Sequence, residues 1–404
     1  MLRRTLLRVS TGIALRADGP IFRSAEASDK SGRYVDVRSF GAKGDGASDD
    51  ATPIQLAIDH AHSNARSTVF VPEGRYLIGK TLRLRRGINL QGAGSFDTER
   101  SSNLTSATDL DGPLIATDRY FGGESSHYFM IQNLCITRST PARLVEHPAI
   151  AFWGAFVGSS IVNVLLLGGY GPAISFEYGF DVLIDRLWIG ACTTKGHAVE
   201  INRLDVGGGP IGVLDFGNVY VENVSNVLNG QPRLHRSERG RAILARNVHS
   251  LSFREIHSEA CKILLSYEGD GGLLSIGKAS CSFYGDGSLS SAIYVFASVP
   301  GACSLGPVVL YKPAMPLAFL AAKTDSVALS RIDAVSTFFS GIVFGRPSSG
   351  KDEIGHIFGT KIGRGPPRNG AEFVGQVYID VVEQIGYLGL TTGFAQRDWR
   401  RMTE

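Results

Sequence analysis

A six-residue pattern of apolar and polar positions recurs along the chain from about residue 129 onward. Each copy reads apolar, any residue, polar, apolar, any residue, apolar, and the third positions are residues 133, 163, 186, 218 and 255. The steps between copies are therefore 30, 23, 32 and 37 residues. Repeats of about 20 to 40 residues are typical of solenoids, in which each coil packs on the next. The clear copies are Ile131–Ile136, Ile161–Leu166, Ile184–Ile189, Phe216–Val221 and Phe253–Ser258.

A second pattern lies between the copies of the first. Short segments led by a small residue alternate in polarity with a period of two, which is typical of β-strands. Because no helical periodicity separates them, each repeat is expected to hold three short strands. This arrangement predicts a parallel β-helix. The segments are Ala149–Trp153, Ala173–Glu177, Ala198–Asn202, Ala242–Arg246, Ala292–Phe296 and Gly341–Gly345.

The repeat predicts one long domain over residues 28–404. Rungs of about 27 residues between about residues 67 and 400 amount to about twelve rungs. Asn133, Asn163 and Asn218 share the third position of the first pattern. Since Asn tolerates the left-handed conformation, these three side chains are expected to stack at one turn of the coil.

The segment before the rungs, residues 35–94, predicts an N-terminal cap. Glycines at 41, 44 and 46 favour a tight turn, and Asp49 or Asp50 is suited to cap the following helix. We expect this helix to cover the open end of the solenoid, and Asp45, Asp49 and Asp50 to be structural. The apolar face of the helix is formed by Ile54, Ala57, Ile58 and Ala61.

The same segment carries a family resemblance. Residues 37–94 contain VRSFGAKGDGASDDATPIQLAIDHA, TVFVPEGRY and LRLRRGINLQGAG. These stretches resemble the start of the pectate lyase superfamily of right-handed parallel β-helices. That superfamily includes pectate-lyase-3-type proteins, polygalacturonase-like hydrolases, mannuronan epimerases and phage tailspikes. The resemblance implies a right-handed coil and a polysaccharide or oligosaccharide partner, but it does not select one chemistry.

Two signatures of these relatives are absent from the sequence. The chain lacks the Asn-Thr-Asp, paired Asp and Gly-His-Gly signature of polygalacturonases and the Asp-Pro-His-Glu signature of mannuronan epimerases. Lys195-Gly196-His197 is a partial echo of the former, and His197 is interpreted as a turn residue.

Composition narrows the alternatives. A formal net charge of +3 gives no reason to expect a nucleic acid partner. No apolar run approaches the roughly 18 residues of a membrane helix, so no membrane span is expected. The five cysteines show no C-x-x-C spacing, so we expect no zinc or other metal site and interpret them as buried apolar residues.

The first 27 residues resemble an export leader. Arg3 and Arg4 precede a short apolar stretch, and Ala25-Glu26-Ala27 has the form of a cleavage site. This pattern favours a twin-arginine-like signal and a secreted or periplasmic protein. A disordered start of the chain is the alternative.

The resemblance implies that the substrate groove runs along one stacked sheet, and the second pattern then supplies its floor. With apolar residues inward, Glu177, Asn202 and Arg246 are expected at one height on three rungs, with Trp153 one rung before them. Tyr294 is also expected to face outward, and Arg203 follows Asn202. Aromatic rings stack on sugars and polar groups bind their hydroxyls, so the row predicts a sugar site.

Glu177 and Glu200 are the candidate catalytic pair. The two residues are expected to lie one rung apart with an offset of two residues. Their Cβ atoms should then be about 7 to 8 Å apart. Carboxyl groups roughly 6.5 to 9.5 Å apart suit an inverting glycosidase, with one acid and one base. Asp205 and Asp181 are alternatives. The competing interpretation is that both glutamates are solvated charges on an exposed sheet.

A polysaccharide lyase would use the same groove differently. Here Arg246 and Arg203 would neutralise a uronate carboxylate while a base removes the neighbouring proton. No cofactor is expected for the hydrolase, whereas calcium is an option for the lyase. Its ligands would be Glu177, Glu200 and Asp205.

A second column, at the fifth position of the first pattern, holds Trp188, Tyr220 and His257. It is interpreted either as a secondary glycan-binding strip or as a surface covered by a loop or a neighbouring subunit, and the second interpretation is favoured.

The sequence therefore predicts a polysaccharide-degrading glycoside hydrolase. A lyase acting on an acidic glycan is the first alternative, and a non-catalytic, tailspike-like adhesion protein is the second. The chain is expected to be a monomer or a homotrimer.

Overall fold

The structure is a computed structural model, and its contacts divide the chain between Arg33 and Tyr34. The predicted leader, residues 1–27, lies outside the described residues. The structure describes residues 34–65, 67–96, 100–139, 146–203, 211–228, 231–233, 240–259, 261, 263–268, 272–282, 293–296, 302–305, 308–311, 317–321, 342–344, 353–357, 360–363, 366–367, 377–380, 385–389 and 399–401.

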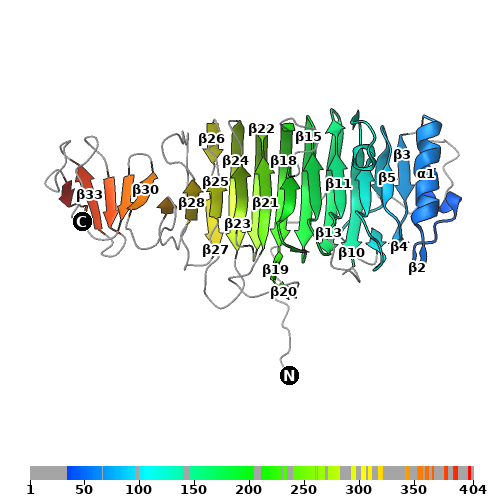
Figure 1. Cartoon of the computed structure of the whole chain (residues 1–404), viewed down its shortest axis with the longest axis horizontal. Helices are drawn as coiled ribbons and strands as arrows, with labels where there is room; N and C mark the ends of the chain where they lie inside the picture. The colour runs from blue at the N-terminus through cyan, green and yellow to red at the C-terminus, as the bar shows by residue number, and fades with distance from the viewer. Residues whose placement is uncertain are drawn as a thin grey trace, which may run out of the picture. The chain divides into compact units, whose positions relative to one another are not determined.

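Two long parallel sheets dominate the unit that begins at Tyr34 (Figure 1). The first, sheet A, contains β1 (Val35–Asp36), β3 (Thr68–Val71), β6 (Asn89–Gly92), β10 (Met130–Arg138), β13 (Ser159–Gly168), β15 (Val182–Gly190), β18 (Ile211–Glu222), β22 (Val248–Glu259), β24 (Leu273–Ser282) and β26 (Ala302–Leu305). Joined to it are β2 (Asp45–Asp49), β4 (Gly74–Ile78), β7 (Ser102–Ser106) and β27 (Val308–Tyr311).

Sheet B contains the strands of the second pattern together with further strands of the same coil. Its order is β5 (Leu82–Leu84), β8 (Ile115–Thr117), β11 (Ile150–Trp153), β14 (Ile174–Glu177), β17 (His197–Ile201), β21 (Arg241–Arg246), β23 (Ile263–Glu268), β25 (Ile293–Phe296), β28 (Leu317–Ala321) and β29 (Ile342–Phe344). Small sheets flank the coil and contain β9 (Ser126–His127) with β12 (Ala155–Phe156), and β16 (Thr193–Thr194) with β19 (Ser225–Leu228) and β20 (Gln231–Arg233).

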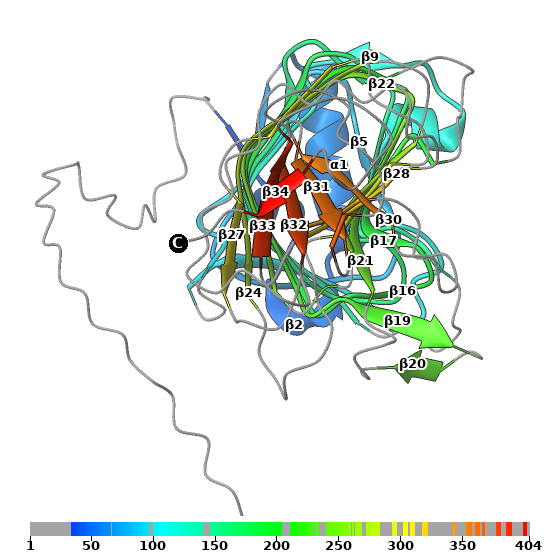
Figure 2. The same ribbon diagram turned by 90° about the vertical axis from the view of Figure 1, so that its left-hand side faces the viewer.

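Strands alternate between the two sheets along the chain, so successive coils lie behind one another in the end-on view (Figure 2). Equivalent apolar residues stack inside, for example Ile131, Ile161 and Ile184 in sheet A. In sheet B, Ile174 pairs with Val199 in the same way, and all five side chains are fully buried. This architecture confirms the predicted parallel β-helix, and its right-handed coiling stays an expectation from the family resemblance.

The predicted asparagine stack forms in part. Asn133 and Asn163 both adopt the left-handed conformation, with φ of 55°, and Asn163 Nδ2 donates to Asn133 Oδ1 at 2.7 Å. The next left-handed residue at this turn is Arg186, with φ of 50°. Asn218 instead continues its strand opposite Glu255, so the stack ends before it.

The N-terminal helix α1 (Ala51–Ser63) buries the predicted apolar face against the first strands. Asp49 accepts from the N–H of Ala51 at 3.0 Å. Asp50 instead accepts from the N–H groups of Lys43 and Gly44, which holds the glycine turn. The two carboxylates thus have the structural roles expected for them. The other helices among the described residues are the 3₁₀ turns η1 (Val37–Phe40) and η2 (Asp118–Phe121).

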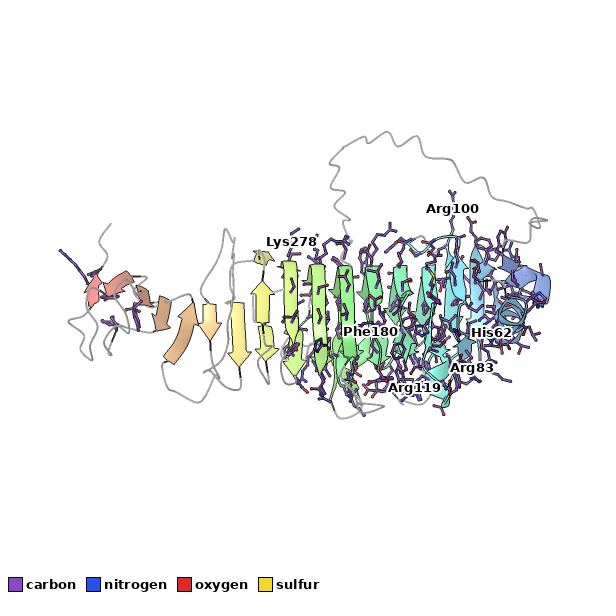
Figure 3. The ribbon with its side chains drawn as sticks, turned by 90° about the horizontal axis from the view of Figure 1, so that it is seen from above. His62, Arg83, Arg100, Arg119, Phe180 and Lys278 are labelled. Atoms are coloured by element: carbon purple, nitrogen blue, oxygen red, sulfur yellow. The ribbon has the colours of Figure 1, made fainter. Side chains whose placement is uncertain are left out.

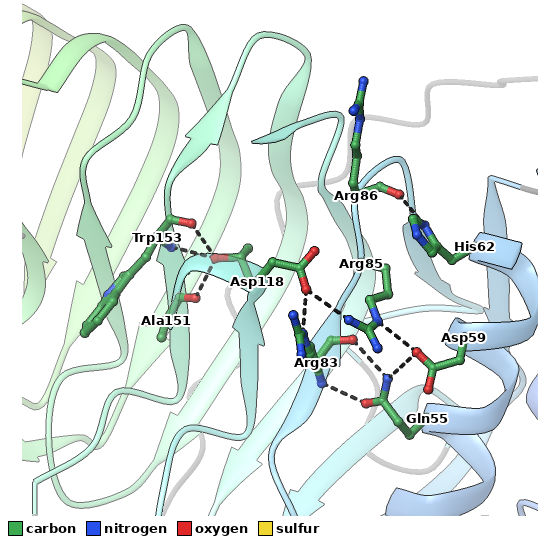
Figure 4. Close-up of polar contacts among 10 residues, drawn as sticks. Gln55, Asp59, His62, Arg83, Arg85, Arg86, Asp118, Ala151 and Trp153 are labelled. Atoms are coloured by element: carbon green, nitrogen blue, oxygen red, sulfur yellow. Dashed lines mark hydrogen bonds and ion pairs between the residues drawn. The ribbon is translucent and has the colours of Figure 1, made fainter. Parts of the chain in front are cut away.

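Paired polar contacts tie α1 to β5 and η2 (Figure 4). Gln55 exchanges hydrogen bonds with the backbone of Arg83 at 2.8 and 3.1 Å. Arg85 donates to Asp59 on the helix at 2.9 Å and to Asp118 on η2 at 3.3 Å. Asp118 also accepts from Arg83 at 2.5 Å. These bonds fix η2 beside the strand that ends at Trp153.

A third sheet follows in the chain and contains β30 (Glu353–Ile357), β31 (Thr360–Gly363), β32 (Val377–Asp380), β33 (Ile385–Gly389) and β34 (Trp399–Arg401). Three of its four pairings are antiparallel, which differs from the expectation that parallel rungs continue to about residue 400. Two residues join β30 to β31, a length that suits a hairpin and is too short for a parallel crossover. The number of about twelve rungs stays a prediction.

Cys135, Cys192 and Cys261 are buried free thiols, as expected for small apolar residues, while Cys281 and Cys303 have side chains outside the described set. Among the residues that the structure describes, no helix has the length and apolarity that a membrane crossing requires.

Candidate functional site

The candidate site lies on the outer side of sheet B, where two columns of side chains run across successive strands. The pairings Ser175–Glu200 and Trp153–Glu177 set these columns. Glu177 and Glu200 therefore lie on adjacent strands, offset by two residues, as the sequence predicted. Further along, Arg246 pairs with Glu268 in the column that Trp153 and Glu177 begin.

The two glutamates are buried, which differs from the expected exposed face. Glu177 is 1% exposed and Glu200 is 3% exposed. Neither is therefore a solvated surface charge. For Glu200 the reason lies in its neighbours, because Arg203 and the turn at Gly196 lie directly over the carboxylate. Buried carboxylates cost free energy unless partners compensate them, so their position requires a polar network.

Arg203 provides the main compensation. Its Nη1 donates to both oxygens of Glu200, at 2.7 and 2.9 Å, and the N–H of His197 donates to Oε1 of Glu200 at 3.2 Å. The hydrogen bond to Glu200 raises the pKa of Arg203, and the charges of Glu200, Glu146 and Glu177 act in the same direction. Glu177 thus lies within the electrostatic reach of the same guanidinium.

The network continues onto the next two strands. Arg246 donates from Nη1 to the backbone oxygen of Arg203 at 2.7 Å and from Nε to Glu268 at 2.8 Å. It also makes a second ion-pair contact with Glu268 through Nη2. Three coils therefore contribute to one connected set of charges.

His197 belongs to this network as well. Its Nε2 lies 2.9 Å from Oγ of Ser266, and the residue is buried. Burial lowers the pKa of His197 to about 3, and the charges of Arg241, Arg203 and Arg246 add to the effect. The imidazole is therefore neutral at physiological pH.

Trp153 lies next to the carboxylates, and its ring is partly covered. Its indole N–H donates to Oγ of Ser175 at 3.0 Å, and its ring meets Tyr120 of η2 at a centroid distance of 4.9 Å. Its backbone N–H donates to Thr117 at 2.9 Å (Figure 4). The aromatic neighbour predicted for the sugar site is thus held in a fixed orientation.

The strand ends and registers change the predicted outward row. Asn202 turns into the left-handed conformation, with φ of 56°, and is fully buried, so it does not continue the row of Glu177. Tyr294 pairs with Leu265, which pairs with Ile243, so β25 is shifted by one residue from the expected register. Asp205 lies outside the described residues.

Sequence reasoning missed His197, Ser266 and Glu268 as members of the network. His197 had been assigned to a turn. The strand Ile263–Glu268 has no leading small residue, and only its alternating polarity, with Ser266 and Glu268 two residues apart, signalled an outward face.

The part of the chain that the structure describes contains no cluster of side chains suited to hold a metal ion. No three His, Cys, Asp or Glu side chains gather there in a metal-binding arrangement. Of the three oxygen ligands considered for calcium, Glu200 is engaged by Arg203 and Asp205 is outside the described set.

The second column forms on sheet A as the sequence predicted. Trp188 pairs with Tyr220, and Tyr220 pairs with His257, on β15, β18 and β22. Phe96, in the connection that follows β6, lies against Trp188 with ring centroids 6.0 Å apart. A connecting segment thus covers one end of the column, in line with the favoured interpretation, but the column also lines a groove.

Comparison with known proteins adds a family match. Residues 34–184 match the family model described as "Rhamnogalacturonase A/epimerase, pectate lyase-like". The predicted resemblance to the pectate lyase superfamily is confirmed for this part of the chain.

Among curated proteins, the chain is 38% identical over 100 residues to mannuronan C5-epimerase AlgE3 of Azotobacter vinelandii, covering 20% of this chain and 5% of that protein. It is 34% identical over 107 residues to alginate lyase 7 of the same organism, covering 25% of this chain and 12% of that protein. The chain thus spans only a small fraction of these relatives' lengths.

Among solved structures, the phiAB6 phage tailspike, in complex with oligosaccharides of Acinetobacter baumannii surface polysaccharide, is similar over 92% of this chain and 57% of that one. The TM-score is 0.44 and the identity 15%. The A-module of mannuronan C5-epimerase AlgE6 of Azotobacter vinelandii is similar over 78% of this chain and all of that one, with a TM-score of 0.31 and an identity of 12%.

Proposed function

From the match of residues 34–184 to the pectate lyase-like family, we propose that the chain is a polysaccharide-degrading enzyme with its active site on the outer side of sheet B. We further propose a glycoside hydrolase that uses Glu177 and Glu200. The observation that carries the proposal is the pair of buried carboxyls on adjacent strands, of which Glu200 is bound by the guanidinium of Arg203 and Glu177 acts on it through its charge. Such buried charged groups are costly and are commonly kept for function.

Their surroundings suggest a role for each carboxyl. Glu200, with Arg203 on both oxygens, would act as the base that activates water. Glu177, next to Trp153 and further from the ion pair, would protonate the leaving oxygen. Two carboxyls in different environments, one ionised and one protonated, are the requirement of this chemistry. The proposed hydrolase needs no cofactor.

The substrate that suits this face is an acidic glycan. Arg203, Arg241 and Arg246 all act on His197 as positive charges. This same observation favours a second candidate, a polysaccharide lyase, in which Arg203 or Arg246 would neutralise a uronate carboxylate and calcium could assist. The alginate lyase and mannuronan epimerase names among the relatives support an acidic substrate class. We also propose export from the cytoplasm, on the leader-like pattern of residues 1–27.

The test is a panel of acidic and neutral polysaccharides with two measurements on each sample, reducing ends and the ultraviolet absorbance of unsaturated uronate. The hydrolase produces reducing ends without absorbance, and the lyase produces both. Glu177→Gln and Glu200→Gln should each lower the activity by at least about 100-fold. Glu73→Gln, a change at an exposed position between β3 and β4, is the matched control and should keep full activity. Activity unaffected by both active-site changes would overturn the assignment, and binding without product would favour the adhesion protein.

A further inference from the structure

A groove of about 340 Å³ lies on sheet A, away from the carboxylates of sheet B. One wall is the aromatic strip, which we define as Trp188, Tyr220 and His257, the outward residues of three adjacent strands. The groove is lined by Phe96, Arg186, Leu187, Trp188, Asn218, Val219, Tyr220, Glu255 and His257.

The rings of the strip contact one another in order along the coil. Trp188 and Tyr220 have ring centroids 4.5 Å apart, and Tyr220 and His257 have centroids 4.4 Å apart with planes 18° from parallel. His257 is oriented by Oγ of Ser280, 2.7 Å from its Nδ1. Phe96, which is 49% exposed, closes the end of the groove at Trp188. The apolar wall is therefore rigid and partly open to solvent.

Polar groups line the opposite rim at matching positions. Asn218 and Glu255 are direct partners across β18 and β22, and Arg186 precedes Asn218 by one strand. Arg186 and Asn218 are exposed, and Glu255 is held by Lys278 at 2.6 Å. An apolar ring surface facing a few fixed donors and acceptors is the arrangement that binds a pyranose.

The groove differs from the outer face of sheet B in the charged side chains that surround it. Its rim carries one cation, Arg186, and one carboxylate, Glu255, which is already paired with Lys278. Two residues beyond the strip stand Glu222 and Glu259, which pair across β18 and β22. Burial raises the pKa of Glu222, and the nearby charge of Glu259 raises it further. The cations Arg186 and Lys278 are thus matched by nearby carboxyl groups, so the groove offers an acidic sugar no excess of positive charge.

We propose that this groove binds a neutral hexopyranose unit of a polysaccharide, as a second site separate from the Glu177–Glu200 site. In Figure 3, Lys278 and Arg100 lie along one margin of the described coil, and Arg83 and Arg119 lie along the opposite margin. Lys278 donates to Glu255 of the rim, while Arg83 neighbours η2 and the Trp153 side. The groove would anchor a chain whose acidic units are processed elsewhere, and it does not depend on the glutamates being catalytic.

The test uses tryptophan fluorescence of the full chain, which has three tryptophans. The Trp153→Phe variant lacks the tryptophan fluorescence from sheet B. A fluorescence change when a glycoside is added to this variant therefore comes from Trp188 or Trp399. The probes are the methyl glycosides of glucose, galactose and mannose, with methyl glucuronoside as the charged match to the glucoside. At least one neutral glycoside should change the fluorescence of the Trp153→Phe variant. The change should be absent from the double variant that carries both Trp153→Phe and Trp188→Phe. The glucuronoside should bind the groove more weakly than the glucoside.

Two variants locate the binding. Phe96→Ala should weaken it by about three- to tenfold, because a single aromatic contact is lost. Asn218→Ala, an exposed rim position, should weaken it to a similar extent. Leu273→Ala is the matched control, since Leu273 is 57% exposed on the same sheet outside the groove. Leu273→Ala should bind the neutral glycosides with the affinity of the parent.

Absence of binding by all three neutral glycosides, or equal affinity in Phe96→Ala and the parent, would overturn the proposal. Preference for the glucuronoside would also overturn it. These outcomes are independent of the polysaccharide panel, so a failure here leaves the proposed hydrolase intact, and the reverse also holds.

Discussion

One guanidinium nitrogen of Arg203 lies 2.7 and 2.9 Å from the two carboxylate oxygens of Glu200, three residues earlier in the chain. The side chain of Glu200 is 4% exposed and that of Arg203 is 40% exposed. The pair therefore joins a buried charge to one that reaches solvent. The carboxylate depends on the guanidinium, because water cannot replace it at that depth.

Replacing the cation tests this dependence. Arg203→Ala should lower the free energy of unfolding by about 1 to 3 kcal/mol, less than for a fully buried pair because the guanidinium is partly exposed. Urea unfolding measures the change. Arg203→Ala combined with Glu200→Gln should recover much of the loss, since no buried charge is then left. An equal loss in the single and double variants would contradict the account.

His197 predicts a pH dependence of stability. Its folded pKa of about 3 lies below the usual value of 6.5, so the unfolded chain binds more protons between these limits. The contribution of His197 to the free energy of unfolding is constant above about pH 6.5. Below that pH the free energy of unfolding falls as the pH drops toward 3. At about pH 4.5 the loss from this residue should be about 2 to 3 kcal/mol.

The measurement compares urea unfolding at neutral pH and at about pH 4.5 for the parent and for His197→Gln. The variant should lose less stability on acidification than the parent. His62→Gln, at a histidine on the helix α1, is the control and should follow the parent. If the two curves of parent and His197→Gln run in parallel, the imidazole is not held neutral.

A single methyl group added at Gly196 should disturb the proposed catalytic site. A Cβ at this position would lie 2.1 Å from Oε1 of Glu200 and 3.1 Å from Nη1 of Arg203, so the ion pair would have to move. Gly196→Ala should therefore lower activity by about 100-fold, as expected when a reacting group is displaced by about 1 Å. At Gly94 the same change meets only a backbone oxygen at 3.8 Å, and Gly94→Ala should be neutral. Full activity of Gly196→Ala on the best substrate of the panel would argue against a catalytic Glu200.

At Asn163 we expect the glycine variant to be more stable than the alanine variant. Its left-handed φ of 55° strains any residue with a Cβ, while its side chain donates to Asn133. Asn163→Ala should lose both the hydrogen bond and the conformational tolerance, about 2 kcal/mol in total. Asn163→Gly keeps the conformation and should lose only about 1 kcal/mol. Thermal or urea unfolding of both variants gives the order, and a more stable alanine variant would contradict it.

The regular part of the fold was open to prediction because it depends on local alternation. Glu177 and Glu200 were placed on adjacent strands with the correct offset, since a small residue marks the same position near the start of both strands and each strand keeps a period of two. The same rule failed at Tyr294, because the small residue Ala292 precedes a strand whose pairing is shifted by one position. Register in such a strand is decided by which column of apolar residues it extends, not by its own sequence alone.

The burial of the carboxylates was not open to prediction in this way. It depends on Arg203 folding back over its own strand and on Arg246 reaching from the next coil to a backbone oxygen. Asn202 left the expected row because its backbone turned left-handed at the strand end, a change that one residue makes without altering the apolar pattern. Contacts between coils are long-range in sequence, and a pattern of single residues does not encode them.

The network from Glu200 through Arg203 and Arg246 to Glu268 links strands that leave the ribosome at different times. While the chain ends near residue 203, Glu200 and Arg203 can meet, but the coil that supplies Arg246 has not yet been made. The arrangement reaches its final form only after Glu268 has been synthesised and paired in β23. A chain interrupted between these points would carry both candidate catalytic glutamates in an unfinished setting, so activity should emerge late in synthesis, after the fold of the first coils is already in place.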